Sequence, residues 1–331
     1  MSDFRALRLH APAAGVTAPI ARIETLGEEE LPPGDVLLQV AYSSLNYKDA
    51  LVQAGLNGIV RDYPRIGGID LSGTVLRSTD PRWKAGDRVA AHGLGLGVSH
   101  DGGHADRCRL PGDWLIRLPA DMSTLDAATI GAAGYTAALS LHLMEHNGLE
   151  PSAGPVVVTG ATGGVASVAI DILAQRGYRV VALSGKDDAH GYLMELGATE
   201  VLSRHTVRMG TRPLEKGQWA GAIDSVGGPT LAWLTRTMLP QGVITAFGNA
   251  GGAELATTVM PFILRGVRLI GISGSGSVRL RDEVWRKLAA EYRPRHLARI
   301  ATLIDLDELP AAAERMLAGR TRGRTVVRLQ P

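Results

Sequence analysis

The segment from Val156 to Ala166 reads Val156-Val157-Val158-Thr159-Gly160-Ala161-Thr162-Gly163-Gly164-Val165-Ala166. An apolar strand runs into a glycine-rich turn, and the turn opens an apolar helix predicted over residues 163–175. Glycines let the backbone approach a pyrophosphate, and the start of the helix supplies N–H groups and a positive dipole end. With a strand before it and a helix after it, the turn is a stronger candidate for dinucleotide binding than for a tight turn without ligand. Its cofactor residues are Thr162, Gly163, Gly164 and Val165.

Strands and helices alternate from this segment towards the C-terminus, which is typical of a parallel, doubly wound α/β sheet. The predicted strands are 155–159, 179–183, 201–202, 222–224, 243–247 and 268–272. The predicted helices after 163–175 are 188–196, 230–238, 261–264, 282–292 and 294–301.

The first third of the chain has a different pattern. Short apolar or alternating runs at 6–10, 36–42, 73–77 and 88–91 are separated by turn residues such as Pro32-Pro33-Gly34. Such runs predict a barrel-like, partly open β domain. A helix over 309–317 and a strand over 324–329 follow the α/β region, and periodicity alone leaves open whether they return to the first domain.

Composition excludes several classes of protein. The chain of 331 residues has a formal net charge of +2, so bulk charge gives no argument for nucleic-acid binding. Cys108 is the single cysteine, which rules out an intrachain disulfide and a zinc site made of several thiolates. No signal peptide or long uncharged apolar run is readable, so we expect no membrane span and a cytoplasmic location.

The residues at the end of the second predicted α/β strand indicate whether NAD or NADP is bound. A site that prefers NAD has an acidic residue there for the ribose 2′-hydroxyl, but this chain has Ser184, Gly185 and Lys186. A hydroxyl, an open backbone and an ammonium suit a 2′-phosphate, and Arg204 after the next strand could add a second cation. We therefore predict NADP, while a register that uses the acidic pair 187–188 stays open.

A later loop, Phe247-Gly248-Asn249-Ala250-Gly251-Gly252, ends another predicted strand. Ligands of open α/β sheets bind outside the carboxyl ends of the strands. Gly248 and Asn249 are therefore candidates for a nicotinamide pocket, and an ordinary glycine turn is an equal alternative.

In this order, these motifs resemble the medium-chain dehydrogenase/reductase superfamily, in its zinc-free quinone-reductase-like branch and its acrylyl-CoA reductase group. The resemblance covers nearly the whole chain. The most specific matching stretches are Ser44-Leu45-Asn46-Tyr47-Lys48-Asp49-Ala50-Leu51 and Thr257-Thr258-Val259-Met260-Pro261-Phe262-Ile263-Leu264-Arg265; the others are 68–75, 112–115, 134–137, 212–216, 219–224 and 323–325. Three positions depart from the family pattern, namely Ala166 for glycine, Lys186 for arginine and Asn249 for a larger apolar residue.

The resemblance implies a partly open, GroES-like β-barrel catalytic domain over 1–125 and 303–331. It also implies an NADP-binding Rossmann domain over 126–302. Members of this branch form homodimers through late Rossmann strands, which would here lie near Gly266–Ser273. The implied partners are a small-molecule substrate and a second copy of the chain, without nucleic acid or membrane.

No metal site is readable. Zinc-dependent relatives have Gly-His-Glu where this chain has Gly68-Ile69-Asp70, and isoleucine cannot bind a metal. The histidines at 92, 100 and 104 suit a solvated hairpin loop better than a zinc site.

Without a metal, the substrate must already be polarised, as an α,β-unsaturated carbonyl or a quinone is. Hydride then adds at the β-carbon, and the protein must stabilise charge on the carbonyl oxygen and supply a proton. The resemblance places Asn46 and Tyr47 at the nicotinamide, as catalytic candidates, and Tyr47 could also orient the cofactor. The alternatives are that Asn46 caps a helix and that Tyr47 only packs.

We therefore predict NADPH-dependent reduction of a short 2-enoyl-CoA, acrylyl-CoA to propionyl-CoA by family analogy. Basic residues in the first domain could meet the nucleotide tail of coenzyme A, and they are Lys48, Arg61, Arg65, Arg82 and Lys84. The alternatives are an NADPH:quinone or enone reductase and a non-catalytic NADPH-binding redox sensor.

Overall fold

The computed structural model describes residues 3–274 and 276–329, and these form two compact units. The first unit gathers described residues within 1–133, 274–282 and 297–331. The second gathers residues 134–273 and 283–296. In the described part of the chain, no helix has the length and apolar character that crossing a membrane requires.

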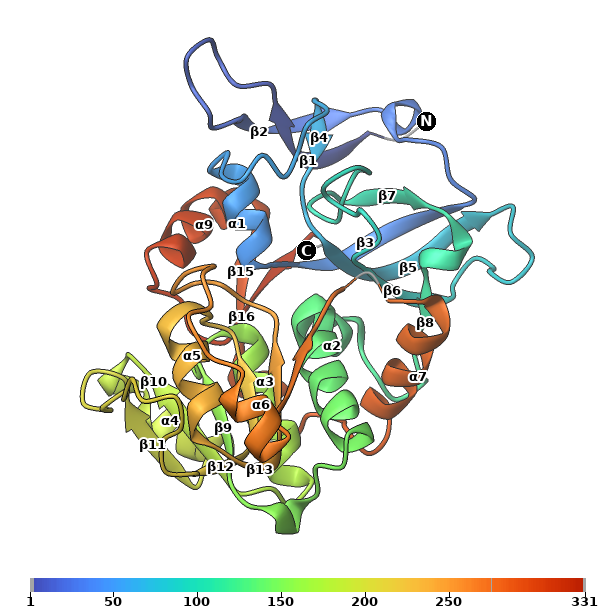
Figure 1. Ribbon diagram of the computed structural model, residues 1–331. Coiled ribbons are helices and arrows are strands. Elements are labelled where there is room, and N and C mark those ends of the chain that lie inside the picture. The colour runs from blue at the N-terminus through green and yellow to red at the C-terminus, as the bar shows by residue number, and fades with distance from the viewer. Residues whose placement is uncertain (1–2, 275, 330–331) are drawn as a thin grey trace. The chain divides into compact units, whose positions relative to one another are not determined.

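The second unit is built on a parallel sheet with the strand order β11-β10-β9-β12-β13-β14 (Figure 1). Counted along the chain, this is the 3-2-1-4-5-6 order of the doubly wound dinucleotide-binding fold, whose ligands bind where the order reverses. That point lies between β9 and β12. The strands are β9 (Val156–Thr159), β10 (Val180–Ser184), β11 (Glu200–Ser203), β12 (Trp219–Asp224), β13 (Met238–Ala246) and β14 (Arg268–Gly271).

Helices α3 (Gly164–Gln175) and α4 (His190–Glu195) follow β9 and β10, and helices α5 (Gly228–Thr237) and α6 (Met260–Arg265) follow β12 and β13. In the described chain, the segment that joins β11 to β12 contains no helix. The central strand explains why the sheet forms here. Val156, Val157 and Val158 are fully buried, and β-branched side chains suit a strand that is covered on both faces. The predicted Rossmann sheet is confirmed.

The first unit contains two sheets, with strand orders β2-β1-β4 and β15-β16-β3-β5-β6-β8, and β7 also pairs with β3. Leu38, Val40, Val89 and Leu110 are fully buried between these elements. The strands are β1 (Phe4–His10), β2 (Ile20–Leu26), β3 (Val36–Leu45), β4 (Arg65–Ile66), β5 (Asp70–Ser78), β6 (Arg88–His92), β7 (Arg107–Leu110), β8 (Ile116–Arg117), β15 (Ala301–Asp305) and β16 (Arg324–Arg328).

The last strand of the chain completes the sheet of the first unit. β16 lies between β15 and β3, and Thr325 is paired with Leu45. Helices from distant parts of the sequence, α1 (Tyr47–Gln53) and α9 (Leu309–Leu317), lie side by side in the same unit (Figure 1). The C-terminal strand is therefore part of the same sheet as β3.

The chain leaves the first unit inside helix α2 (Thr124–His146), which is interrupted at Gly131 (φ 46°, ψ −152°). The predicted domain boundary lies at 125/126, and the contact boundary lies at 133/134, because Thr129 and Ala132 bind side chains of the first unit. Residues 274 and 276–282, predicted in the Rossmann domain, pack with the first unit. Buried Arg281, in α7 (Val278–Leu288), donates there to the carbonyl oxygens of Asp113 and Trp114.

Two local predictions were wrong. Of the predicted helix 294–301, only Leu297–Ile300 (α8) is helical, because Ala301 begins strand β15. This strand is fixed by pairing with β16, which lies more than twenty residues later in the sequence. β2 was not predicted, because its only partner in the described residues is β1 and its side chains show little burial. Short 3₁₀ turns lie at Glu28–Glu30, Gly112–Trp114, Pro151–Ala153, Asp187–Ala189 and Leu306–Glu308.

Candidate active site and cofactor loops

The glycine-rich turn joins β9 to α3 at the carboxyl end of the parallel sheet. Gly160 has a φ of 56°, and a Cβ there would lie 2.3 Å from the Ser225 hydroxyl, so this point needs glycine. Gly163 is exposed, and a Cβ on it would meet only the Gly160 carbonyl oxygen, at 3.2 Å. The first bond of the helix joins the Ser167 N–H to the Gly163 carbonyl, so the N–H groups of residues 164–166 have no helical acceptor. This open turn fits a pyrophosphate.

The predicted residues Thr162, Gly163, Gly164 and Val165 lie together on this turn. Thr162 is buried, whereas Gly164 and Val165 are half-buried. Ala166 is 1% exposed under the first turn of α3. A methyl group is thus accommodated where the family usually has glycine.

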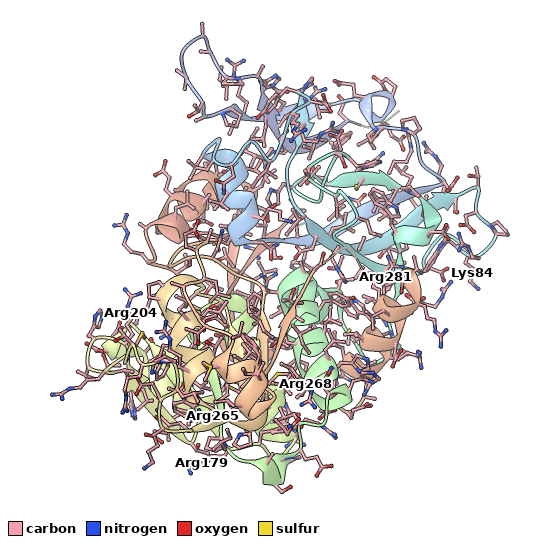
Figure 2. The ribbon with its side chains drawn as sticks, viewed as in Figure 1. Lys84, Arg179, Arg204, Arg265, Arg268 and Arg281 are labelled. Carbon is pink, nitrogen blue, oxygen red and sulfur yellow. The ribbon has the colours of Figure 1, made fainter. Side chains whose placement is uncertain are left out.

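The loop after β10 lies against the turn after β11. Ser184 is buried, and its hydroxyl accepts the Lys186 N–H at 2.9 Å. A Cβ on Gly185 would lie 2.4 Å from Nε of Arg204, so the guanidinium packs directly over this glycine and would have to move if a larger residue replaced it. The Arg204 N–H donates to the Ser184 carbonyl at 2.8 Å. Arg204 is exposed, and Figure 2 labels it in the part of the second unit that contains β10 and β11.

One of the two acidic residues that could bind a ribose hydroxyl is held elsewhere. Asp187 follows the loop, and its carboxylate accepts the Ser203 hydroxyl at 3.0 Å. This contact ties the carboxylate to the end of β11. Asp187 is therefore engaged, whereas Asp188 beside it is exposed.

Two further loops follow β12 and β13. Gly248 would clash with the Ser225 carbonyl oxygen if it carried a Cβ (2.2 Å), and the Gly251 N–H donates to the Val226 carbonyl at 2.7 Å. Asn249 is exposed between them. The loop predicted around Gly248 and Asn249 thus packs by its backbone on the loop that follows β12.

Asp224 anchors the loop after β12, and sequence reasoning gave it no role. Its buried carboxylate accepts the Thr159 hydroxyl at 2.6 Å and the Gly227 N–H at 2.8 Å. Burial raises the pKa of this carboxyl, and these donors oppose that shift. Asp224 thereby joins β9 to β12 at the reversal of strand order.

In the first unit, Asn46 and Tyr47 begin α1 directly after β3. Tyr47 is 44% exposed, and its hydroxyl has no hydrogen-bond partner among the described residues. Asn46 is 8% exposed; its Nδ2 donates to Asp70 at 3.0 Å and Asp49 at 3.2 Å, and its Oδ1 accepts from Arg324 at 2.9 Å. Both amide hydrogens of Asn46 are therefore engaged, whereas the Tyr47 hydroxyl is available.

The Asp49 carboxylate also holds the start of α1. It accepts the Asn46 N–H at 2.8 Å and the Ile69 N–H at 3.0 Å. Burial raises the pKa of the Asp49 carboxyl, and His104 and the donors from Asn46 oppose that shift. This carboxylate caps α1, which agrees with the helix-start alternative for Asn46.

A buried ion pair supports this helix start. Asp70 and Arg324 are 1% and 2% exposed, and Arg324 Nη2 lies 3.3 Å from Asp70 Oδ2. Asp70 also accepts the N–H groups of Ser44 (3.0 Å) and Ala132 (2.9 Å), and Arg324 Nε donates to the Thr129 carbonyl at 3.0 Å. The pair thus connects β3, β5, β16 and α2 around Asn46.

These donors do not fit a zinc ion. Ile69 has no ligand atom, and Asp70 already accepts from several protein groups. No group of three or more His, Cys, Asp or Glu side chains that could hold a metal is found in the described ranges. No catalytic step here is therefore assigned to a metal.

The prediction of a solvated histidine loop was wrong. His92 and His104 are 3% and 0% exposed, and His100 is half-buried. His104 Nε2 donates to the Ser44 carbonyl oxygen at 3.3 Å. Close contact with Gly67 and Gly68 encloses the His104 ring, and loop sequence alone does not reveal such packing.

A doubly wound sheet with a glycine-rich turn, joined to a β-rich unit, defines a two-domain α/β oxidoreductase. Known families match both parts. Residues 32–120 match the alcohol dehydrogenase GroES-like domain, and residues 164–291 match the zinc-binding dehydrogenase family.

Three relatives match nearly the whole chain. "Putative quinone oxidoreductase YhfP" of Bacillus subtilis is 45% identical over 98% of this chain and 99% of its own length. Acrylyl-CoA reductase AcuI of Ruegeria pomeroyi is 42% identical over 93% of this chain and 94% of its own. The yhdH oxidoreductase from Salmonella enterica, whose crystal structure is in complex with NADP, is 45% identical in sequence. The structural match covers 98% of this chain and 100% of the Salmonella chain, with a TM-score of 0.94. The chain belongs to the medium-chain dehydrogenase/reductase superfamily, among its quinone-oxidoreductase-like and acrylyl-CoA reductase members.

Proposed function

We propose that this protein reduces the carbon–carbon double bond of a short 2-enoyl-CoA with NADPH, converting acrylyl-CoA to propionyl-CoA without a metal. The observation that carries the proposal is the Tyr47 hydroxyl, presented without a protein partner on a helix start fixed by the Asp70–Arg324 pair. The similarity to AcuI supports the substrate class.

The proposed cofactor site belongs to the second unit. The turn at residues 162–165 holds the pyrophosphate, and Gly185, Lys186 and Arg204 meet the 2′-phosphate. Ser184 positions that loop, since its hydroxyl is used by Lys186. Gly248 and Asn249 contribute to the nicotinamide pocket. When bound, NADPH supplies the hydride. The NADP complex of the Salmonella relative supports this choice of cofactor.

The first unit is proposed to stabilise the negative charge that develops on the substrate during the reaction. When hydride reaches the β-carbon of the thioester, negative charge develops on the carbonyl oxygen. Tyr47 donates a hydrogen bond to that oxygen, and a donor in this role is worth about 100-fold in rate. Asn46 positions Tyr47 and does not itself donate, because Asp70 and Asp49 hold its amide hydrogens. The α-carbon takes a proton from solvent, which completes the reduction.

A quinone or free enone is the second candidate substrate, and the basic residues of the first unit favour it. Arg65 is paired with Asp101 at 3.0 Å, and Arg82 with Asp80 at 2.5 Å. Among the described residues, Lys48, Arg61 and Lys84 form no ion pair; Lys84 is labelled in Figure 2. Fewer cations thus remain for the coenzyme A phosphates than the sequence indicates.

The deciding experiment follows NADPH absorbance with four substrates, namely acrylyl-CoA, the acrylyl thioester of N-acetylcysteamine, 1,4-benzoquinone and a free enone. Each is repeated with NADH. A clear preference for acrylyl-CoA over the truncated thioester supports the proposal, since only the nucleotide tail differs. Faster turnover of quinone or enone supports the second candidate. NADPH binding without turnover supports a redox sensor.

We also propose that two copies of the chain pair through β14. Within the described residues, β14 is an edge strand with β13 as its one neighbour. On the preceding helix α6 and just before it, Val259, Ile263 and Leu264 are 65%, 68% and 60% exposed. An unpaired strand edge beside exposed apolar side chains is suited to a self-complementary interface.

A further inference from the structure

The turn after β11 contains a histidine that the proposed cofactor site has not used. His205 follows Arg204 and is exposed, and its Nε2 lies 3.1 Å from the Gly185 carbonyl oxygen. Gly185 is the glycine over which Arg204 packs. The imidazole thus lies against the loop after β10, which the 2′-phosphate would approach in the proposed site.

This contact determines which ring nitrogen of His205 carries a hydrogen. A carbonyl oxygen only accepts, so Nε2 must carry the hydrogen. In the neutral ring, Nδ1 then has a lone pair, which repels an anion. In the charged ring both nitrogens donate, and Nδ1–H can bind a phosphate oxygen.

The charged groups around His205 come from two loops. Lys186 and Arg204 are cationic, and they belong to the loops that follow β10 and β11. Asp187 is held by the Ser203 hydroxyl at 3.0 Å, and Asp188 is exposed beside it. A bound phosphate dianion would favour the charged form of the imidazole, because it attracts all three cations at once.

We propose that His205 takes up a proton when the 2′-phosphate of NADPH binds and that it is a specificity-determining residue of this site. The proton comes from solvent and goes to Nδ1. NADPH binding is then coupled to proton uptake, and by reciprocity NADPH affinity rises as pH falls. NADH lacks the phosphate, so its binding takes up no proton at His205. This inference rests on the proposed NADPH site and is independent of the substrate.

The test is calorimetry of NADPH and NADH binding at pH 7.5 in two buffers that differ in ionisation enthalpy. At this pH the phosphate is already largely a dianion, since its second ionisation lies near pH 6. We expect NADPH, but not NADH, to take up a fraction of a proton. His205→Gln keeps a neutral donor for Gly185, so it should abolish the uptake and weaken NADPH binding about tenfold. NADH affinity should not change.

Two variants complete the design. His205→Lys keeps a charge without a titrating ring, so it should bind NADPH tightly with no proton uptake. His190→Gln, at an exposed histidine of α4 in the same unit, should behave like the wild type. Equal proton uptake in the wild type and His205→Gln would overturn the inference. Failure of the wild type to prefer NADPH over NADH would instead overturn the proposed cofactor site.

Discussion

The pKa of His92 lies well below that of an exposed histidine. Burial lowers its pKa from the usual 6.5 to about 4, Arg281 acts in the same direction, and Asp70 opposes them. Between these values the unfolded chain binds a proton that the folded chain does not. Stability contributed by neutral His92 is therefore present above pH 6.5 and is lost as pH falls towards 4, by up to about 3 kcal/mol.

This effect predicts the slope of stability against pH. The urea midpoint of the wild type should fall between pH 7 and pH 5, and His92→Gln should flatten that fall. The slope of stability against pH is the quantity to compare, because the substitution also changes packing and therefore stability itself. His190→Gln removes an exposed histidine and should keep the wild-type slope. An equal slope in His92→Gln would show that other groups carry the dependence.

Tyr47 offers the sharpest test of chemistry at a single atom. Tyr47→Phe removes only the hydroxyl, which has no partner in the described structure and is 44% exposed. Stability should change by less than about 0.5 kcal/mol. The kcat for acrylyl-CoA should fall about 100-fold, with unchanged NADPH affinity. Unchanged kcat would leave Tyr47 only a packing role.

At the scale of elements, β16 carries two arginines in very different surroundings. Arg324 is 2% exposed against Asp70, whereas the Arg328 side chain is 47% exposed beside Asp305. Arg324→Met leaves Asp70 buried without its cation and should cost about 3–5 kcal/mol of folding free energy. The matched change Arg328→Met, in the same strand, should cost less than about 1 kcal/mol.

Chemical denaturation measures both variants, and the first unit should lose stability in Arg324→Met. The double variant Asp70→Asn with Arg324→Met removes both charges and should recover part of the loss. A loss in the double variant as large as the sum of the single losses would mean that the two side chains act independently.

Sequence pattern predicts elements that are locally determined. The valine run of β9 and the apolar helix after it could be read directly, because both are buried on almost all sides. β2 and β15 could not, because the side chains of each are largely exposed and each strand is fixed by pairing with another strand. The break at Gly131 depends on contact with Asp70 and Arg324, which no periodicity encodes.

The same limit applies to the site. Gly185, Lys186 and Arg204 follow from strand ends, so their proximity could be predicted from topology. The hydrogen bonds of the Asn46 side chain involve Asp70 and Arg324, which lie 24 and 278 positions away in the sequence. The position of the His205 ring depends on one hydrogen bond between two loops. A charged residue inside a predicted strand, such as Arg324, was the available signal for the buried pair.

At the scale of the whole molecule, the proposed dimer makes a prediction about Ile263. This side chain is 68% exposed on α6. Ile263→Glu should convert a dimer to a monomer in light scattering, because a buried unpaired charge costs several kcal/mol. Leu76→Glu, at a 38% exposed position of β5, should leave the dimer intact. A monomeric wild type would overturn the proposed pairing.

The position of β16 inside the sheet of the first unit has a consequence for synthesis on the ribosome. β3 is translated early, but its neighbour β16 emerges only after about 280 further residues. At about 5–20 residues per second, the end of β3 from Tyr42 to Leu45 waits roughly 15–60 s with one edge unpaired. The parallel sheet of the second unit is made almost entirely in that interval. The nascent chain therefore depends on protection of an early strand edge until translation is nearly finished.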